Sequence, residues 1–317
     1  MKQPLQAGKE TGSRSVAANR KLIVGTRGSP LALAQTNSVI AALCEKFPET
    51  MFETKIITTA GDEQARKSRG KDSFTGTIDQ ALRDGEIDFA VHSLKDVPTE
   101  QFDLEIASFP KREAPRDALI SRDSRTKLFD LPKGATIGTS SARRAIQLRA
   151  ARQDLKIIEI SGNVQTRILK LKRPDSPLHA IVLAEAGLKR LGISAEATEI
   201  LPTRIMLPAP GQGCLAITVR KGDETTKKLA AQIDDHDTRI VATCERSFSK
   251  ALGGGCDLPV AALARIAIKD GRKIISLEGL VRSSGSTQSI VRGRIDGGIS
   301  EAEKIGRTLA AKLVGFA

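Results

Sequence analysis

Short apolar segments that alternate with helical segments are the feature that most constrains the fold of this chain. The apolar segment 21–26 (KLIVGT) leads directly into a helical one, where Ser29 is a good N-cap and Pro30 suits the first turn. The same order of strand, turn and helix recurs at 135–152 and at 178–192. Alternation of this kind is typical of α/β domains, in which helices cover a largely parallel sheet.

The pattern changes near residue 236, where a helix is followed by a glycine run and then by consecutive strands. In this region we expect a helix at 238–252, strands at 258–268, 274–282 and 286–295, and a final amphipathic helix at about 300–314. Earlier in the chain we expect strands at 54–59, 87–94 and 156–161 and helices at 77–85 and 163–172. These blocks predict two α/β domains and a smaller α+β domain.

The composition favours a small anionic ligand over nucleic acid. The 317 residues include 50 Lys+Arg against 37 Asp+Glu, and the resulting formal net charge of +13 attracts anions. The chain has no Trp or Tyr and only 9 Phe, so it is poorly equipped to stack unpaired bases. No apolar run reaches the roughly 18 residues that span a bilayer, so we expect a chain without membrane segments.

The cysteines and the N-terminal segment indicate the compartment. Cys44, Cys214, Cys244 and Cys256 are scattered without a C-x-x-C pair, which favours a reduced, intracellular environment without disulfides or structural zinc. The three histidines are dispersed as well, so no metal site is expected. Residues 1–20 lack apolar periodicity and hold four basic residues against one acid. A disordered extension is favoured for them, and an organelle transit peptide is the alternative.

Arginines lie at or near the predicted N-termini of three helices, in the junctions 26–29 (TRGS), 140–144 (SSARR) and 161–167 (SGNVQTR). A cation in the first turn is unfavourable by roughly 0.3–1 kcal/mol, because the helix dipole places partial positive charge there. A bound anion between the arginines and the free backbone N–H groups removes this conflict. The alternative is that the arginines point to solvent or pair with acids. Three junctions together favour a cleft for a ligand with several carboxylates or phosphates.

Two further residues are candidates for direct chemistry. Asp96 follows a predicted buried strand and Lys95, and it precedes Val97-Pro98. As a carboxylate in a cleft built for anions it suits a cationic group on a substrate; the alternative is a structural turn aspartate. Cys256 follows three glycines, which can present its thiol on a loop; the alternative is a small buried side chain.

At these residues the chain closely resembles the porphobilinogen deaminase (hydroxymethylbilane synthase) family. The most specific segments in combination are 88–98 (DFAVHSLKDVP) and 138–144 (GTSSARR). Further matching segments lie at 25–33, 162–167, 186–192, 210–213 and 254–256. The likeness covers about 21–317.

The resemblance implies an α/β protein of three domains. The first two are expected to resemble type II periplasmic binding proteins and to cover 21–111 with 213–231, and 117–206. A smaller α+β domain at 236–317 is expected to carry the cofactor cysteine, and 1–20 is expected to precede the folded part.

The resemblance also implies the reaction. The family's cofactor is a dipyrromethane held by a thioether to the cysteine that matches Cys256. Four porphobilinogen molecules are condensed head to tail with loss of ammonia, and hydroxymethylbilane is released for haem biosynthesis. A cytoplasmic, monomeric transferase that binds neither nucleic acid nor membrane is expected.

The roles of individual residues are carried over from the family motifs. Asp96 is expected to be the catalytic group. The expected cofactor contacts, besides Cys256, are Lys95, Ser29, Ser141, Arg143 and Arg144, and the expected substrate contacts are Arg27, Arg167, Arg190, Lys71 and Phe74.

The chain departs from the family pattern at two places. Ser161 stands where the family usually has an arginine, and Asp72-Ser73 replaces a small and apolar pair in the loop at 61–76. Two rival classes stay open on the residues alone. A non-catalytic anion-binding module explains the arginines but not Asp96 together with Cys256, and a nucleic-acid-binding protein explains only the net charge.

Overall fold

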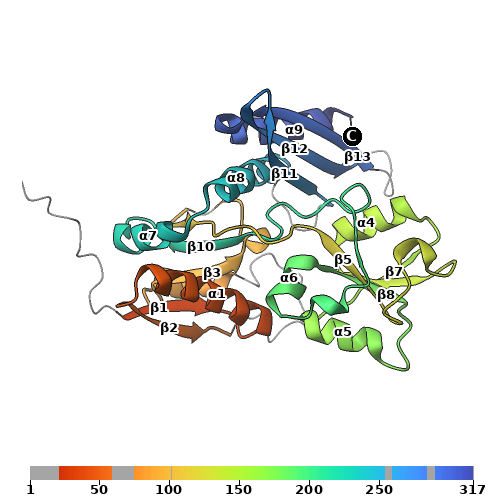
Figure 1. The fold of residues 1–317 in the computed structure, drawn as a ribbon, viewed down its shortest axis with the longest axis horizontal. Coiled ribbons are helices and arrows are strands. Elements are labelled where there is room, and N and C mark those ends of the chain that lie inside the picture. The colour runs from red at the N-terminus through yellow and green to blue at the C-terminus, as the bar shows by residue number, and fades with distance from the viewer. Residues whose placement is uncertain (1–20, 59–74, 101, 254–258, 284–289, 317) are drawn as a thin grey trace, which may run out of the picture.

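Three sheets organise the part of the chain that the structure, a computed structural model, describes (Figure 1). The described residues are 21–58, 75–100, 102–253, 259–283 and 290–316. Lys71, Phe74, Cys256 and the segment 1–20 therefore lie outside the described residues.

The first sheet has the strand order β2-β1-β3-β10-β4. β1 (Lys21–Thr26) pairs in parallel with β2 (Met51–Ile56) and with β3 (Phe89–Ser93). β10 (Leu215–Arg220) runs antiparallel between β3 and β4 (Leu104–Ser108). β10 follows all the strands of the second sheet in the sequence, so the chain returns to the first sheet after completing the second.

The second sheet repeats this arrangement in the order β7-β6-β8-β5-β9. β6 (Thr136–Gly138) pairs in parallel with β7 (Lys156–Ile158) and β8 (Ala180–Ala184). β5 (Asp117–Ser121) is antiparallel to β8 and to β9 (Glu199–Ile200). Both sheets thus have an antiparallel strand in the fourth position, which confirms the prediction of two similar α/β units.

Helices flank both sheets, and side-chain caps define where several of them begin. The helices of the first unit are α1 (Pro30–Lys46), α3 (Gly76–Arg83) and α7 (Glu224–Ala230), and those of the second are α4 (Ala142–Ala151), α5 (Val164–Lys172) and α6 (Glu185–Arg190). Ser29, Ser141 and Asn163 cap α1, α4 and α5, each accepting a backbone N–H from the first turn. Within the described ranges, no helix is both long and apolar enough to cross a membrane.

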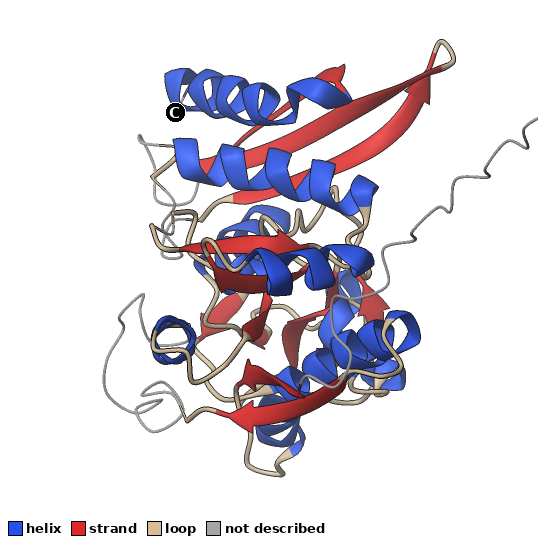
Figure 2. Ribbon diagram, turned by 90° about the vertical axis from the view of Figure 1, so that its left-hand side faces the viewer, coloured by secondary structure: helices blue, strands red, loops and turns tan. Residues whose placement is uncertain are grey.

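The third unit is a smaller α+β layer at one end of the molecule (Figure 2). Its antiparallel sheet is β11 (Ala261–Lys269), β12 (Arg272–Arg282) and β13 (Ile290–Gly298), packed against α8 (His236–Ala251) and α9 (Ala302–Phe316). The two helices approach closely at Gly306, where an added Cβ would lie 2.5 Å from the carbonyl oxygen of Cys244. This unit completes the predicted fold class.

Some predicted element boundaries are wrong. The strand expected at 54–59 is found at Met51–Ile56, and the strand expected at 156–161 ends at Ile158. Both are edge strands with alternating or exposed side chains, so their apolar signal is weak. The strands β4, β5 and β10 were not predicted, although all three are largely buried.

Candidate active site

The two α/β units meet where helices from both begin. An added Cβ at Gly187 on α6 would lie 3.6 Å from Cδ2 of Leu31 on α1 and 3.9 Å from Cγ2 of Val164 on α5. The first turns of α1 and α5 therefore lie next to α6 at this junction. Helix N-termini at the carboxyl ends of parallel strands are the usual place for anionic ligands in α/β proteins.

Serine side chains cap α1 in the first unit and α4 in the second. Ser29 Oγ accepts a hydrogen bond from the backbone N–H of Ala32 at 3.3 Å, and Ser141 Oγ accepts one from Arg144 at 3.4 Å. Each cap satisfies one of the orphan N–H groups of its first turn and leaves others for a ligand. The predicted ligand contacts Ser29 and Ser141 thus also act as structural caps.

Arg143 and Arg144 share one buried carboxylate, that of Asp117 at the start of β5. Arg143 Nη1 and Nη2 lie 2.8 Å and 3.2 Å from the two oxygens of Asp117, and Arg144 Nε lies 3.0 Å from Oδ1. Burial alone raises the pKa of Asp117, but the two guanidinium groups outweigh it and lower the pKa to about 2. At this junction the arginines therefore pair with an acid, the alternative that the sequence left open.

Lys95 and Asp96 extend this charged group from the first unit. They occupy the 3₁₀ turn Leu94–Asp96 directly after β3, with Lys95 half-buried and Asp96 exposed. Burial lowers the pKa of Lys95; Asp96 and Asp117 oppose this shift, whereas Arg144 and Arg143 add to it. Lys95 therefore lies within electrostatic range of groups from both units, and the strand end delivers Asp96 to the same place.

Arg167 adds a further cation from α5. Its Nε donates to the carbonyl oxygen of Gly162 at 2.7 Å, and burial, followed by repulsion from Arg144, lowers its pKa. We call Lys95, Arg143, Arg144 and Arg167 the cation cluster. Its four positive charges outnumber the two carboxylates Asp96 and Asp117, so the site carries an excess of positive charge. Arg27 is half-buried at the turn between β1 and α1.

Arg190 is placed differently, at the hinge between the units. Its Nη2 donates to the carbonyl oxygen of Gly213 at 2.7 Å, beside a cavity of about 210 Å³ that Glu113 and Leu215 also line. Gly213 has φ +88°, and an added Cβ would lie 2.3 Å from the carbonyl oxygen of Glu113. The Arg190 guanidinium thus holds the turn before β10, and its predicted role as a substrate contact stays a prediction.

Buried polar residues that contact Asp117 or extend from it were not predicted from the sequence. Gln212 Nε2 donates to Asp117 Oδ1 at 3.1 Å, and Arg112 Nε donates to the carbonyl oxygen of Gln212 at 3.0 Å. Arg112 Nη1 in turn lies 2.7 Å from Oε1 of the fully buried Glu245 on α8. A hydrogen-bonded chain thus connects the arginine pair to the third unit. A charged residue inside an otherwise apolar strand or helix face, as at Asp117 and Glu245, is the signal that points to such residues.

Two of the three described cysteines are buried and poorly suited to react. Burial raises the pKa of both Cys214 and Cys244 to about 12, so neither readily forms a thiolate. Cys44 is exposed on α1. Within the described ranges, no group of three or more His, Cys, Asp or Glu side chains could hold a metal ion.

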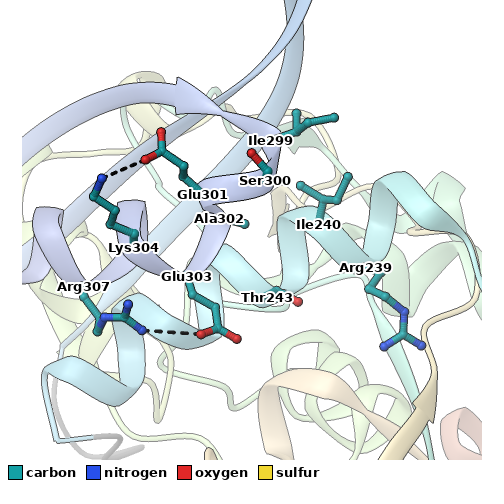
Figure 3. A pocket seen from close by; sticks show the side chains of 10 residues that line it. All are labelled: Arg239, Ile240, Thr243, Ile299, Ser300, Glu301, Ala302, Glu303, Lys304 and Arg307. Carbon is teal, nitrogen blue, oxygen red and sulfur yellow. Dashed lines mark hydrogen bonds and ion pairs between the residues drawn. The ribbon is translucent and has the colours of Figure 1, made fainter.

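A larger pocket of about 480 Å³ lies elsewhere, between α8 and the start of α9 (Figure 3). Most of its charged side chains are paired: Lys304 Nζ lies 2.8 Å from Glu301, Arg307 Nη1 lies 3.4 Å from Glu303, and Arg239 pairs with Asp234 outside the pocket lining. None of the predicted site residues lines this pocket. The cation cluster is therefore the better candidate for the active site.

The fold and the cation cluster define a class: a two-unit α/β protein with a cluster of cations at the junction and an α+β domain attached. One solved structure similar to this chain is a Salmonella typhimurium periplasmic binding protein with high arginine specificity. It is 18% identical, with a TM-score of 0.40, over 69% of this chain and 94% of that one.

Family models and curated relatives identify the particular family. The dipyromethane cofactor binding domain of porphobilinogen deaminase matches residues 22–228, and the C-terminal domain of porphobilinogen deaminase matches residues 240–315. The porphobilinogen deaminase of Deinococcus radiodurans is 45% identical over 93% of this chain and 96% of its own length. That of Thermus thermophilus is 44% identical over 92% and 94%. The chain belongs to the porphobilinogen deaminase family, as the sequence motifs predicted.

Proposed function

We propose that Asp96 and the cation cluster perform the family's reaction in this chain, on a cofactor tethered to Cys256. The chain is a transferase, a hydroxymethylbilane synthase of tetrapyrrole biosynthesis. It condenses four porphobilinogen molecules head to tail, with loss of ammonia, and releases hydroxymethylbilane. The observation that carries the assignment of the site is the convergence of Lys95 and Asp96 from the first unit with the arginine pair of the second.

The site fits a dipyrromethane cofactor. Such a cofactor carries an acetate and a propionate on each of its two rings, and the cation cluster has an excess of positive charge. The region matched by the dipyromethane cofactor binding domain contains both sheets and the whole cluster. When bound, the dipyrromethane supplies the pyrrole carbon to which substrate units are joined. Lys95, Ser29, Ser141, Arg143 and Arg144 are proposed to bind and orient it.

Cys256 is the proposed point of attachment. It follows the end of α8, at Ala251, by five residues and comes after three glycines. The buried thiols of Cys214 and Cys244, with pKa values of about 12, are unsuited to forming a thioether. The high pKa values of these two thiols disfavour either as the attachment point and so support Cys256.

Asp96 is proposed as the catalytic residue. Its exposed carboxylate can accept the pyrrole N–H of the substrate and stabilise the positive charge that develops as ammonia leaves. The neighbouring Lys95 lies within electrostatic range of that carboxylate and of the arginine pair. The site therefore offers one carboxylate to a cationic group of the ligand and several cations to the ligand's carboxylates.

The remaining assignments follow the family match. Substrate carboxylates are proposed to bind Arg27, Arg167 and Arg190, together with Lys71 and Phe74 outside the described residues. We also propose a cytoplasmic monomer with domains at 21–111 with 213–231, 117–206 and 236–317. The two family-model matches, which change over between 228 and 240, support the boundary of the last domain.

Incubation of the purified chain with porphobilinogen tests the proposal. We expect consumption of porphobilinogen, release of ammonia and formation of hydroxymethylbilane, and an intact mass that exceeds the polypeptide by one dipyrromethane. A protein that binds porphobilinogen without turnover, and whose mass is that of the bare polypeptide, belongs instead to the rival class of non-catalytic binding modules.

A further inference from the structure

The turn that carries Asp96 is held by a residue of the third unit. Arg246 on α8 donates from Nη1 to the carbonyl oxygen of Val97 at 3.2 Å and from Nη2 to that of Pro98 at 2.8 Å. These are the two residues that directly follow Asp96. The planar guanidinium therefore holds two successive carbonyl groups at once, which a flexible ammonium group does less well.

Keeping a charge in this position is costly for the protein. Burial lowers the pKa of Arg246 to about 10. In the described part of the chain, its side-chain hydrogen bonds go to these carbonyl oxygens, and no carboxylate lies within ion-pair distance. One turn later on α8, Lys250 pairs with Glu100 at 3.2 Å, but both side chains of that pair are largely exposed. The helix thus runs along the segment after Asp96, and of these two contacts the one made by Arg246 is the less exposed.

Glu245, the residue before Arg246, anchors the same helix to other parts of the molecule. Glu245 accepts backbone N–H groups from Gly211 at 2.7 Å and from Ala264 at 2.8 Å, besides its pair with Arg112. Adjacent residues of α8 are therefore fixed to the hinge and to the turn that follows Asp96. The helix ends at Ala251, shortly before the proposed cofactor cysteine.

We propose that Arg246 is a positioning residue, which fixes the Asp96 turn against the helix that leads to the cofactor cysteine. The inference rests on the proposed role of Asp96. Asp96 is exposed and lies in a turn of only three residues, so the segment that follows it determines where its carboxylate points. Loss of the guanidinium frees Val97 and Pro98, and a displacement of the carboxylate by about 1 Å can cost a factor of about 10² in rate.

The test compares Arg246→Met, Arg246→Lys, Asp96→Asn and the double variant Asp96→Asn/Arg246→Met, with Lys250→Met as the matched control. We expect Arg246→Met to lower kcat by about 10- to 100-fold, with KM changed less than about threefold. Intact mass should show the cofactor adduct retained. Arg246→Lys should recover part of kcat, and Lys250→Met should behave as wild type.

The double variant separates positioning from a general structural role. If Arg246 acts through Asp96, the double variant is no slower than Asp96→Asn alone, to within about threefold. Wild-type kcat in Arg246→Met, loss of the adduct, or rate losses that multiply in the double variant would each overturn the inference. If Arg246→Met does not fold, the lysine variant and its double variant with Asp96→Asn carry the same comparison. Wild-type activity of Asp96→Asn itself would instead refute the proposed function.

Discussion

Arg143 and Asp117 form a two-point ion pair in the interior, with Nη1–Oδ2 and Nη2–Oδ1 distances of 2.8 Å and 3.2 Å. Arg144 shares the Oδ1 atom, and Gln212 donates to it as well. One buried carboxylate thus allows two adjacent arginines to lie together at a helix N-terminus, where the helix dipole opposes both. The orientation of the arginine pair depends on an acid from a different strand.

The first prediction concerns the stability that Asp117 provides. Asp117→Asn keeps the shape but leaves two buried arginines without their carboxylate, and breaking such a buried pair costs about 3–5 kcal/mol of unfolding free energy. We expect a lower urea midpoint at neutral pH. Glu303→Gln, at an exposed ion pair with Arg307, is the control and should leave the midpoint unchanged.

The same pair makes stability depend on pH. The folded-state pKa of Asp117 is about 2, below the ordinary value of 3.8, so its stabilisation is complete above about pH 4. It is lost as the pH falls from about 4 to about 2. Urea midpoints measured over this range should therefore converge for wild type and Asp117→Asn. A constant difference down to pH 2 would contradict the assignment.

The strand–helix units of the fold could be predicted from the sequence, but the pairing of its antiparallel strands could not. Capped helices after apolar strands, such as the one begun by Ser29, carry their signal within about ten residues of sequence. The strands β5 and β10 were missed because each is antiparallel within its sheet and neither was recognised as part of a strand–turn–helix unit, although a turn at Gly222 and α7 do follow β10. Their places depend on pairing with β8 and β3, which local patterns do not encode.

A second prediction addresses Glu245, at the junction of the three units. Its carboxylate pairs with Arg112 at 2.7 Å and accepts hydrogen bonds from two backbone N–H groups. The Glu245 side chain itself is fully buried. Glu245→Gln leaves Arg112 uncompensated, so we expect a loss of about 3–5 kcal/mol in unfolding free energy. Thermal unfolding monitored by circular dichroism measures it. A variant as stable as wild type would show that the junction does not depend on this charge.

The third prediction is that Asp96→Asn lowers the rate of porphobilinogen consumption by a factor of about 10² to 10³. The amide keeps the shape of the side chain but cannot stabilise positive charge. Asp84→Asn removes an exposed carboxylate from the end of α3 and should leave the rate unchanged. Activity of Asp96→Asn within a few-fold of wild type would remove Asp96 from the mechanism.

The fourth prediction is that Cys256→Ala yields a protein without the dipyrromethane adduct. The cofactor has no other proposed point of attachment, so activity should be lost with it. Cys44→Ala, which changes an exposed cysteine on α1, is the matched control and should keep the adduct. Intact mass spectrometry distinguishes the two variants. An adduct that persists in Cys256→Ala and vanishes in another cysteine variant would refute the attachment site.

The site itself was predictable in its motifs but not in its pairings. Asp96, Lys95 and the arginine junctions are visible in the sequence because they follow strands directly. The partners Asp117 and Arg143 are 26 residues apart, and Arg112 and Glu245 are 133 apart, so only the folded chain brings them together. Whether an arginine faces a ligand or a buried acid depends on these long-range contacts of the folded chain.

The last prediction concerns Ser161, where the family usually has an arginine. Ser161 is exposed in the turn before α5, and its carbonyl oxygen accepts a hydrogen bond from Lys170 Nζ at 3.0 Å. Arg167 folds back in the same way onto Gly162. Two cations of α5 therefore lie beside the position that lacks one.

These neighbours set the size of the effect we expect. An arginine–carboxylate contact in a shielded cleft is worth roughly 1.5–3 kcal/mol, and a serine hydroxyl offers only a neutral hydrogen bond. We therefore expect Ser161→Arg to lower KM for porphobilinogen or to relieve stalling at an intermediate chain length, and Lys170→Met to raise KM. Steady-state kinetics and the masses of the covalent enzyme forms measure both effects. If Ser161→Arg leaves kinetics and masses unchanged or worse, and Lys170→Met behaves as wild type, the site has been rebuilt around serine and neither cation compensates for the missing arginine.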